Sequence, residues 1–225
     1  MPVMIFQVPL WAELSAAGLG GIQGALFAAD IRHRRIDVLG VLVIGLIVAL
    51  GGSLLRDIVL NQPPVVIWMN GYLVVAGAAA VVGMFVQRLL SRVGWLITIL
   101  DAVVMGVFGA IGATKALSLG VGVVGALVVG VLGAIGGGML RDIALNLPVS
   151  FLHVGTLYAV AAGAGVGVLI GLLALGAPMP VAAIVGVVVT TLTRVASVVF
   201  SWTFPERPLA GRRGPTAAPP RPRAR

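Results

Sequence analysis

The sequence has no cysteine and few charged residues, and both shortages restrict what the protein can be. Without cysteine there is no disulfide scaffold and no thiol for catalysis or metal binding. Charged residues make up 10% of the 225 residues, whereas soluble domains carry about 25%. This composition cannot cover a surface that faces water. Only two histidines are present, and no Ser/His pairing or paired-aspartate motif is found, so we expect no enzyme, no metal site and no cofactor.

Hydrophobic residues dominate the chain instead, at 60% of the sequence with a mean hydropathy of +1.14. Several apolar runs exceed the ~20 residues that a bilayer-spanning helix needs, and none alternates as a strand of a membrane barrel does. We therefore predict an all-α polytopic membrane protein whose single transmembrane domain covers residues 1–205. Seven spans are predicted: Trp11–Ile31, Val38–Leu60, Trp68–Leu90, Trp95–Leu117, Leu119–Leu145, Phe151–Leu175 and Val181–Trp202.

Tryptophans and cations indicate how these spans are placed in the bilayer. The four tryptophans all fall at span ends, where their rings favour the headgroup layer. The loop cations gather on one face, in the first loop, the third loop and the tail, which predicts a cytoplasmic C-terminus and an external N-terminus in the plasma membrane. Residues 206–225 are predicted to be a disordered basic cytoplasmic tail near anionic lipid. This tail supplies much of the net charge of +8, and no nucleic-acid partner is expected.

An internal repeat is the most informative feature of the sequence. Gly-Gly-Ser-Leu-Leu-Arg-Asp-Ile at residues 51–58 returns 85 residues later as Gly-Gly-Gly-Met-Leu-Arg-Asp-Ile at residues 136–143. Upstream, Glu13 pairs with Asp101 at an offset of 88 residues. The repeat unit holds three spans, and an odd number makes the two copies enter the membrane from opposite sides. We predict an inverted repeat of residues 12–92 and 95–175, followed by an unrepeated seventh span over residues 181–202.

The glycines of this motif predict where the helices open. Adjacent glycines weaken a helix interior by ~1 kcal/mol each against alanine, and freed carbonyls inside a bilayer can serve as cation ligands. We therefore predict that the second and fifth spans are broken and line an ion path, through Gly51, Gly52, Ser53, Gly136, Gly137 and Gly138. The alternative is that the glycines only let helices pack closely. We assign that packing role to Gly20-x-x-x-Gly24 and to Gly163-x-x-x-Gly167-x-x-x-Gly171.

Charged side chains inside the spans are the other candidate site residues, since such groups usually face a bundle interior or a cavity. An Arg-Asp pair follows each glycine motif, and Asn-x-Pro then ends each helix. Alternating acids and bases would suit a cation path, or the pairs could simply neutralise each other and fix the helix register. Lys115 either lines the path or reaches the interface. Glu13, Asp101 and Arg194 are predicted to be charge partners, with Arg194 next to Asp101. The predicted path residues of this kind are Arg56, Asp57, Arg141, Asp142 and Lys115.

The duplicated Gly-Gly-x-x-x-Arg-Asp, with Asp101-Ala102-Val103, Lys115-Ala116 and Val189-Thr190 running to Arg194, resembles the prokaryotic trimeric intracellular cation (TRIC) channel family. This family is also classified as a glycine-transporter domain family, and the resemblance covers residues 12–205. It implies a homotrimer with a separate pore in each protomer, chiefly for potassium. The residues leave a second function open, because the same inverted repeat would serve a carrier for glycine or another small neutral solute.

Overall fold

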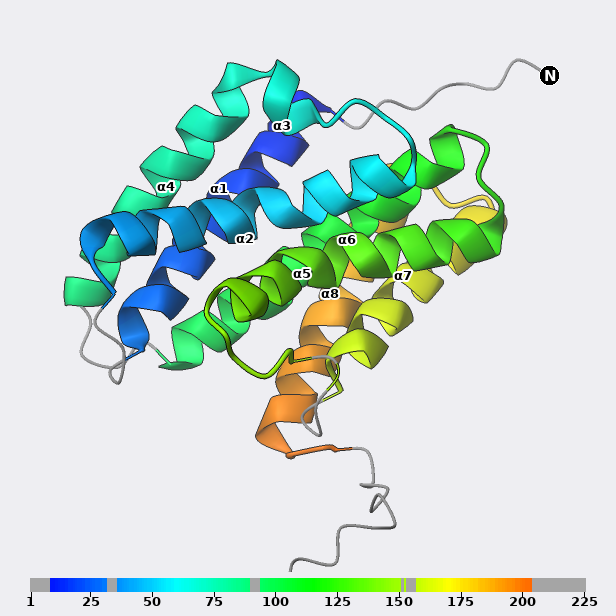
Figure 1. The fold of residues 1–225 in the computed structure, drawn as a ribbon. Helices are drawn as coiled ribbons and strands as arrows, with labels where there is room; N and C mark the ends of the chain where they lie inside the picture. Colours follow the sequence, from blue (N-terminus) through cyan, green and yellow to red (C-terminus); the bar gives the residue numbers. More distant parts are fainter. Residues whose placement is uncertain (1–8, 32–35, 90–93, 151, 153–156, 204–225) are drawn as a thin grey trace, which may run out of the picture.

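The structure is a computed structural model that describes residues 9–31, 36–89, 94–150, 152 and 157–203. Figure 1 shows these residues folded entirely into helices and connecting loops. The helices are α1 (Leu10–Asp30), α2 (Val38–Val59), α3 (Val65–Trp68), α4 (Asn70–Leu89), α5 (Gly94–Ser118), α6 (Val123–Ala144), α7 (Tyr158–Ala174) and α8 (Met179–Val199). The basic tail predicted at residues 206–225 lies outside the described residues.

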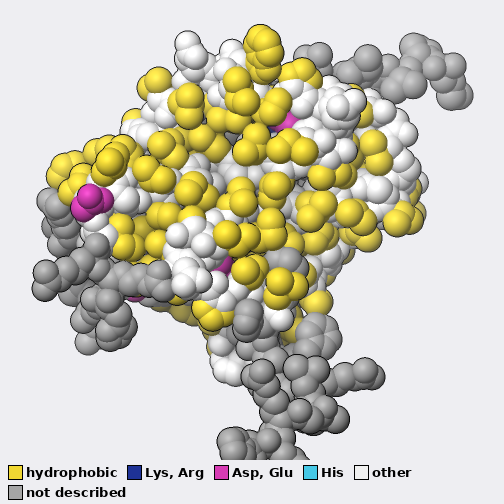
Figure 2. Space-filling model, viewed as in Figure 1, with side chains coloured by type: hydrophobic (Ala, Val, Ile, Leu, Met, Phe, Trp, Pro, Cys, Tyr) yellow, Lys and Arg dark blue, Asp and Glu magenta, His cyan; other side chains and the backbone are white. Residues whose placement is uncertain are grey.

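Five of the described helices are long and apolar enough to cross a membrane: α2, residues 70–87 of α4, α5, α6 and α8. Helix α7 is apolar but has 17 residues, and α1 has 21 residues that include Glu13, Gln23 and Asp30. Figure 2 shows hydrophobic side chains over most of the visible face, with only isolated acidic groups. The all-α polytopic membrane class predicted from composition is therefore confirmed.

Each predicted span contains one long helix, and the boundaries differ for local reasons. The span predicted from Leu119 begins as α6 only at Val123, because Gly120 has a φ of +80° and its amide, like that of Leu119, closes the end of α5. The span predicted from Phe151 contains α7, which begins at Tyr158, and Phe151 itself lies outside the described residues. The short helix α3 was not predicted, because its four residues follow Pro64 within the loop between two predicted spans.

The prediction that the second and fifth spans are broken is wrong. Helix α2 continues through Gly51 and Gly52 to Val59, and α6 continues through Gly136 and Gly137 to Ala144. The propensity penalty of the glycines is smaller than the packing that these glycines allow, which is described below. Both helices therefore keep their carbonyls hydrogen-bonded within the helix at this depth.

The two helices end where Asn-x-Pro predicts. Asn61 and Asn146 have φ values of 52° and 47°, in the left-handed region that asparagine tolerates at the end of a helix. The amide of Gln62 then donates to the carbonyl of Asp57 at 2.8 Å, and the amide of Leu147 donates to the carbonyl of Asp142 at 2.8 Å. These two bonds close the helices within one turn of their Arg-Asp pairs.

The long helices are arranged around α2, α5 and α6. Helices α1 and α4 pack together on one side of the bundle, and α7 and α8 pack together on the other (Figure 1). Helix α2 packs against α6, which runs in the opposite direction, and α1 packs against α5. Many of the buried residues of these helices are alanine, glycine and valine, so the helix axes approach closely.

Candidate functional site

The glycines of the repeated motif lie where α2 crosses α6. A Cβ atom added at Gly51 would stand 3.2 Å from the Cα atom of Gly137, and one added at Gly137 would stand 2.5 Å from the carbonyl oxygen of Val48. Helices come this close only where the facing positions carry no side chain. At Gly51, Gly52, Gly136 and Gly137 the structure therefore supports close packing rather than helix opening.

The contacts at this crossing are reciprocal. The Cβ position of Gly136 lies 3.2 Å from the Cα atom of Gly52, just as that of Gly51 lies 3.2 Å from the Cα atom of Gly137. The residues of the second contact are each 85 positions from their counterparts in the first. Each motif thus meets the other through the same atoms.

The third position of each motif differs between the two copies. The Ser53 hydroxyl is buried and donates to the carbonyl of Leu50 at 2.8 Å, one turn back along α2. A Cβ atom added at Gly138 would instead lie 2.8 Å from the hydroxyl oxygen of Tyr158. Any larger residue at this position would require the Tyr158 hydroxyl to move, which is a physical reason for glycine in the second copy.

A first group of polar side chains meets beside the crossing, from α1, α2, α4 and α5. The Arg56 guanidinium is 2% exposed; its Nε donates to Asp57 Oδ1 at 2.7 Å and its Nη1 to Glu13 Oε1 at 3.3 Å. Lys115 Nζ donates to the same Asp57 oxygen at 2.8 Å, and the Tyr72 hydroxyl donates to the other Glu13 oxygen. We call this group the Arg56 cluster: Glu13, Arg56, Asp57, Tyr72 and Lys115.

A second group with the same parts lies on α5, α6, α7 and α8. Arg141 Nη2 donates to Asp142 Oδ1 at 2.7 Å, and its Nη1 lies 3.7 Å from Asp101 Oδ1. Tyr158 donates to Asp101 Oδ1 at 3.3 Å, and Arg194 Nε lies 3.9 Å from Asp101 Oδ2. The two side chains that the sequence places together, Asp101 and Arg194, thus form an ion pair. We call this group the Arg141 cluster: Asp101, Arg141, Asp142, Tyr158 and Arg194.

Each aspartate of the Arg-Asp pairs also holds the loop that follows its helix. Asp57 Oδ2 accepts from the amide of Val65 at 3.1 Å, at the start of α3. Asp142 Oδ2 accepts from the amide of Ser150 at 3.0 Å and from its hydroxyl at 2.7 Å. One carboxylate therefore connects a buried arginine to the loop beyond the helix in both halves of the chain.

Residues from the other half of the chain contact each cluster. Lys115 of α5 reaches Asp57, and Phe27 of α1 lies beneath Arg141, whose Cζ is 3.7 Å from the ring centroid. Phe27 and Lys115 are 88 residues apart, which is the offset that relates Glu13 to Asp101. Equivalent positions thus supply an ammonium group at one cluster and an aromatic face at the other.

The clusters are neutral as units, since each has two acidic and two basic side chains in contact. Burying a charge without such a partner is strongly unfavourable, and pairing removes most of that penalty. These contacts support the interpretation that the charged side chains neutralise each other. That they also line a cation path stays a prediction. Among the described residues no group of histidine, cysteine, aspartate or glutamate could hold a metal ion.

Four residues that belong to the clusters or contact them were not predicted from the sequence. Tyr72 and Tyr158 are the two tyrosines of the sequence and stand 86 residues apart, a signal of the repeat that was available. Gln23, whose Nε2 donates to Asp101 Oδ1 at 3.2 Å, and Phe27 have no such signal. Their contacts with the Arg141 cluster are known only once α1 is placed against the second half of the chain.

The Asp101–Arg194 pair gives a first testable prediction. Asp101→Asn should lower the melting temperature in detergent, because Arg141 and Arg194 would lose a buried counter-charge worth ~3–5 kcal/mol. Adding Arg194→Leu should restore part of the loss, since one of the two cations that faced Asp101 is then gone and the other, Arg141, still contacts Asp142. Thermal unfolding of the two single variants and the double variant measures this coupling; strictly additive shifts would mean that the pair does not interact.

Comparison with known proteins identifies related membrane proteins. A family model described as Glycine transporter matches residues 10–88 and 98–174. The UPF0126 inner membrane protein YadS of Escherichia coli is 32% identical over 193 residues, which cover 84% of this chain and 90% of YadS. UPF0126 membrane protein YvgT of Bacillus subtilis is 29% identical over 88% of this chain and 96% of its own.

Solved structures show the same fold. A TRIC cation channel aligns with a TM-score of 0.78 and 29% identity over 92% of this chain and all of that one. The TRIC orthologue from Rhodobacter sphaeroides aligns with a TM-score of 0.78 and 28% identity over 86% of this chain and 98% of its own. These relatives are named as membrane proteins and channels, which agrees with the prediction that the chain is not an enzyme.

The helical bundle thus has the architecture of TRIC channels, as the sequence motifs indicated. The chain belongs to the Glycine transporter family, together with the UPF0126 membrane proteins.

Proposed function

We propose that the protein is a cation channel, chiefly for potassium, with one ion path in each protomer of a homotrimer. The observation that carries this proposal is the pair of neutral charge clusters beside the α2–α6 crossing, in a fold shared with TRIC cation channels. A polar route through a membrane protein needs such groups at membrane depth, since they are otherwise costly there. A carrier for glycine or a similar solute is not favoured, because the similar solved structures are channels.

The path proposed here follows α2 and α6 from one cluster to the other. The closely packed crossing at Gly51, Gly52, Gly136 and Gly137, with Ser53 and Gly138 beside it, would form one wall of this path. Arg56, Asp57, Arg141, Asp142 and Lys115 would line it on either side. The Nη2 atom of Arg56 supports a polar route, because it is buried and has no hydrogen-bond partner among the described residues. A buried donor of this kind is unfavourable by ~1–3 kcal/mol unless a polar group or water meets it.

Neutral clusters would favour the passage of an ion over its tight binding. Conduction requires an ion to bind well enough to enter and weakly enough to leave. An acid that already pairs with arginine or lysine attracts a cation only weakly, so an ion passing Asp57 or Asp142 would not be retained. We therefore expect ions to pass these clusters rapidly rather than to be retained.

We further propose that α1, α2 and α4 form one unit and α5, α6 and α7 an inverted copy, with α8 as an unrepeated seventh span. The reciprocal glycine contacts and the two equivalent clusters support this proposal. Three spans in each unit place the ends of α5 and α7 on one face of the membrane and the basic tail on the other.

This topology predicts a labelling pattern that can be measured in intact cells. Because the chain has no cysteine, single cysteines at Ser118, Gly176 and Ala217 report their own positions. A membrane-impermeant maleimide should label the first two from outside and should label Ala217→Cys only after the cells are opened. Labelling of Ala217→Cys in intact cells would mean that the protein has the opposite orientation to the one proposed.

Recording in planar bilayers tests the channel proposal directly. Purified protein in a potassium chloride gradient should give unitary current steps, with a reversal potential close to that of potassium. Preparations of an unrelated membrane protein, purified in the same way, control for contaminating channels. Saturable glycine uptake by proteoliposomes without unitary currents would contradict the proposal and favour a carrier.

A further inference from the structure

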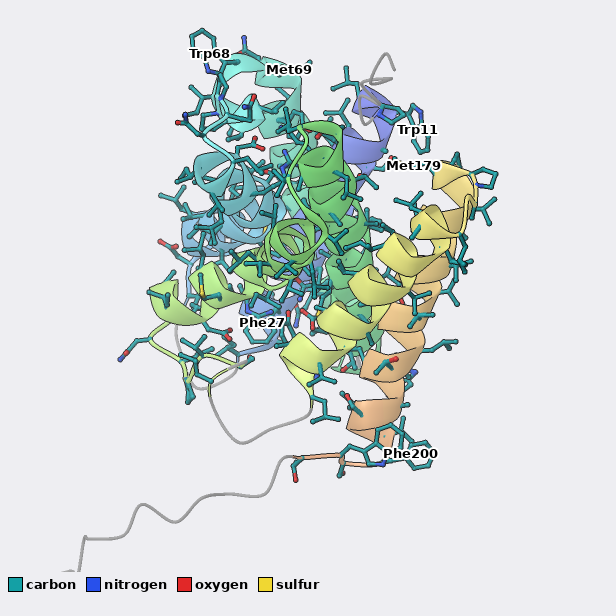
Figure 3. The ribbon with its side chains drawn as sticks, turned by 90° about the vertical axis from the view of Figure 1, so that its right-hand side faces the viewer. Trp11, Phe27, Trp68, Met69, Met179 and Phe200 are labelled. Atoms are coloured by element: carbon teal, nitrogen blue, oxygen red, sulfur yellow. The ribbon has the colours of Figure 1, made fainter. Side chains whose placement is uncertain are left out.

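A groove on the outside of the bundle lies apart from the residues assigned to the ion path. It is a cavity of about 420 Å³ between α1, α5 and α8, within the size range of small-molecule sites. Figure 3 shows Trp11 and Met179, at the beginnings of α1 and α8, at the same end of the molecule, with Phe200 at the opposite end. Residues that define the groove include Trp11, Ser15, Thr114, Met179, Ala183 and Val187.

The lining of this groove offers nothing to a polar ligand. No lining residue carries a charge, and the two hydroxyl groups are already engaged by their own helices. Ser15 Oγ donates to the carbonyl of Trp11 at 2.7 Å, and Thr114 Oγ1 donates to the carbonyl of Ala110 at 2.8 Å. A peptide or a polar solute would lose its hydrogen bonds to water here without replacement. The occupant must therefore be apolar.

The surroundings of the groove identify the class of apolar occupant. Two of its three walls, α5 and α8, are long and apolar enough to cross the membrane. A groove between them on the outside of the bundle would face the hydrocarbon layer. Trp11 is 72% exposed at its rim, as expected for a ring in the headgroup region. We propose that the groove binds one acyl chain of a membrane phospholipid, with the headgroup left outside near Trp11.

The groove lies directly behind the Arg56 cluster. Its lining residues Ala12 and Thr114 are the chain neighbours of Glu13 and Lys115, which belong to that cluster. A bound chain would therefore contact the same turns of α1 and α5 that carry two of the paired charges. The binding itself is independent of the ion path, so it can be tested without any measurement of current.

Protection of an introduced cysteine tests the proposal in a variant that keeps the size of the side chain. Ala183→Cys lies in the groove, and the matched control Ala78→Cys lies on the exposed face of α4. Dipalmitoyl phosphatidylglycerol added to the protein in detergent should slow maleimide labelling of Ala183→Cys at least tenfold and leave Ala78→Cys unchanged. Equal rates with and without lipid at Ala183→Cys would overturn the proposal.

Filling the groove gives the second arm of the test. In native mass spectrometry, Ala183→Trp should lose a lipid that both the wild type and the control Ala78→Trp retain, one for each protomer. Retention of that lipid by Ala183→Trp would overturn the proposal. A third result would also overturn the proposal. If Ala183→Trp dissociates the oligomer and Ala183→Cys is protected from maleimide even without added lipid, a neighbouring subunit covers the groove instead.

Discussion

Alanine at Gly52 or Gly137 should lower the melting temperature in detergent by roughly 3–10 °C. The added methyl group would stand 2.5 Å from the carbonyl oxygen of Val48 in the second variant and would meet the carbonyl of Gly133 in the first. Backbone on the facing helix cannot turn away as a side chain can, so α2 and α6 must separate. Overpacking of this kind typically destabilises by ~1–3 kcal/mol, which gives the expected shift for a chain of this size.

Gly167 and Gly171 of α7 provide the matched control. A Cβ atom added at either meets nothing within 4 Å in the described protomer, although the sequence suggested a packing seam here. Alanine at these positions should leave the melting temperature unchanged or raise it, because alanine favours a helix over glycine by ~1 kcal/mol. A loss in both controls as large as that at Gly52 would show that added volume at the crossing is not the cause.

Asp57→Asn should be the most destabilising of the single charge changes. The Asp57 carboxylate is fully buried and accepts hydrogen bonds from Arg56, Lys115 and the amide of Val65. An amide cannot balance two cations, and one half of it donates where an acceptor is needed. Removing one partner from a buried ion pair typically costs about 3–5 kcal/mol, so we expect a fall in melting temperature and poor recovery of folded protein.

The exposed Asp37 serves as the control on the same helix. Its carboxylate accepts from the amide of Gly40 at 2.7 Å and caps the beginning of α2. Asn caps helices as well as Asp, so Asp37→Asn should change stability by less than ~0.5 kcal/mol. Melting curves of the two variants in one detergent decide the matter; equal shifts would mean that Asp57 contributes no more than a surface carboxylate.

The sequence predicted the helices well because hydrocarbon imposes one requirement on every span. A run of apolar residues must form a helix that satisfies its own backbone, and Asn-x-Pro or a glycine in the left-handed region must end it. The ends of α2 at Val59 and of α6 at Ala144 follow from this requirement alone. The pairing of Asp101 with Arg194 was predictable for the related reason that a buried charge needs a partner.

What the sequence could not decide was the role of the glycines. Broken helices and closely packed helices both need residues without side chains, so Gly52 and Gly137 fit either role until the facing helix is placed. The partners of Lys115 and Phe27 were hidden for a similar reason. Both residues contact the opposite half of the chain, and the offset of 88 residues relates their positions without saying what they touch.

The reciprocal glycine contacts have a consequence for how substitutions combine. Gly52 and Gly137 set the same distance between α2 and α6, each from its own side of the crossing. Once one added methyl group has pushed the helices apart, the second finds the space already open. The effects of the two substitutions on stability should therefore not add. Gly52→Ala combined with Gly137→Ala should lower the free energy of unfolding by little more than either change alone. For the same reason, a shift of α6 that makes room for a larger residue at one position would make room for one at the other as well.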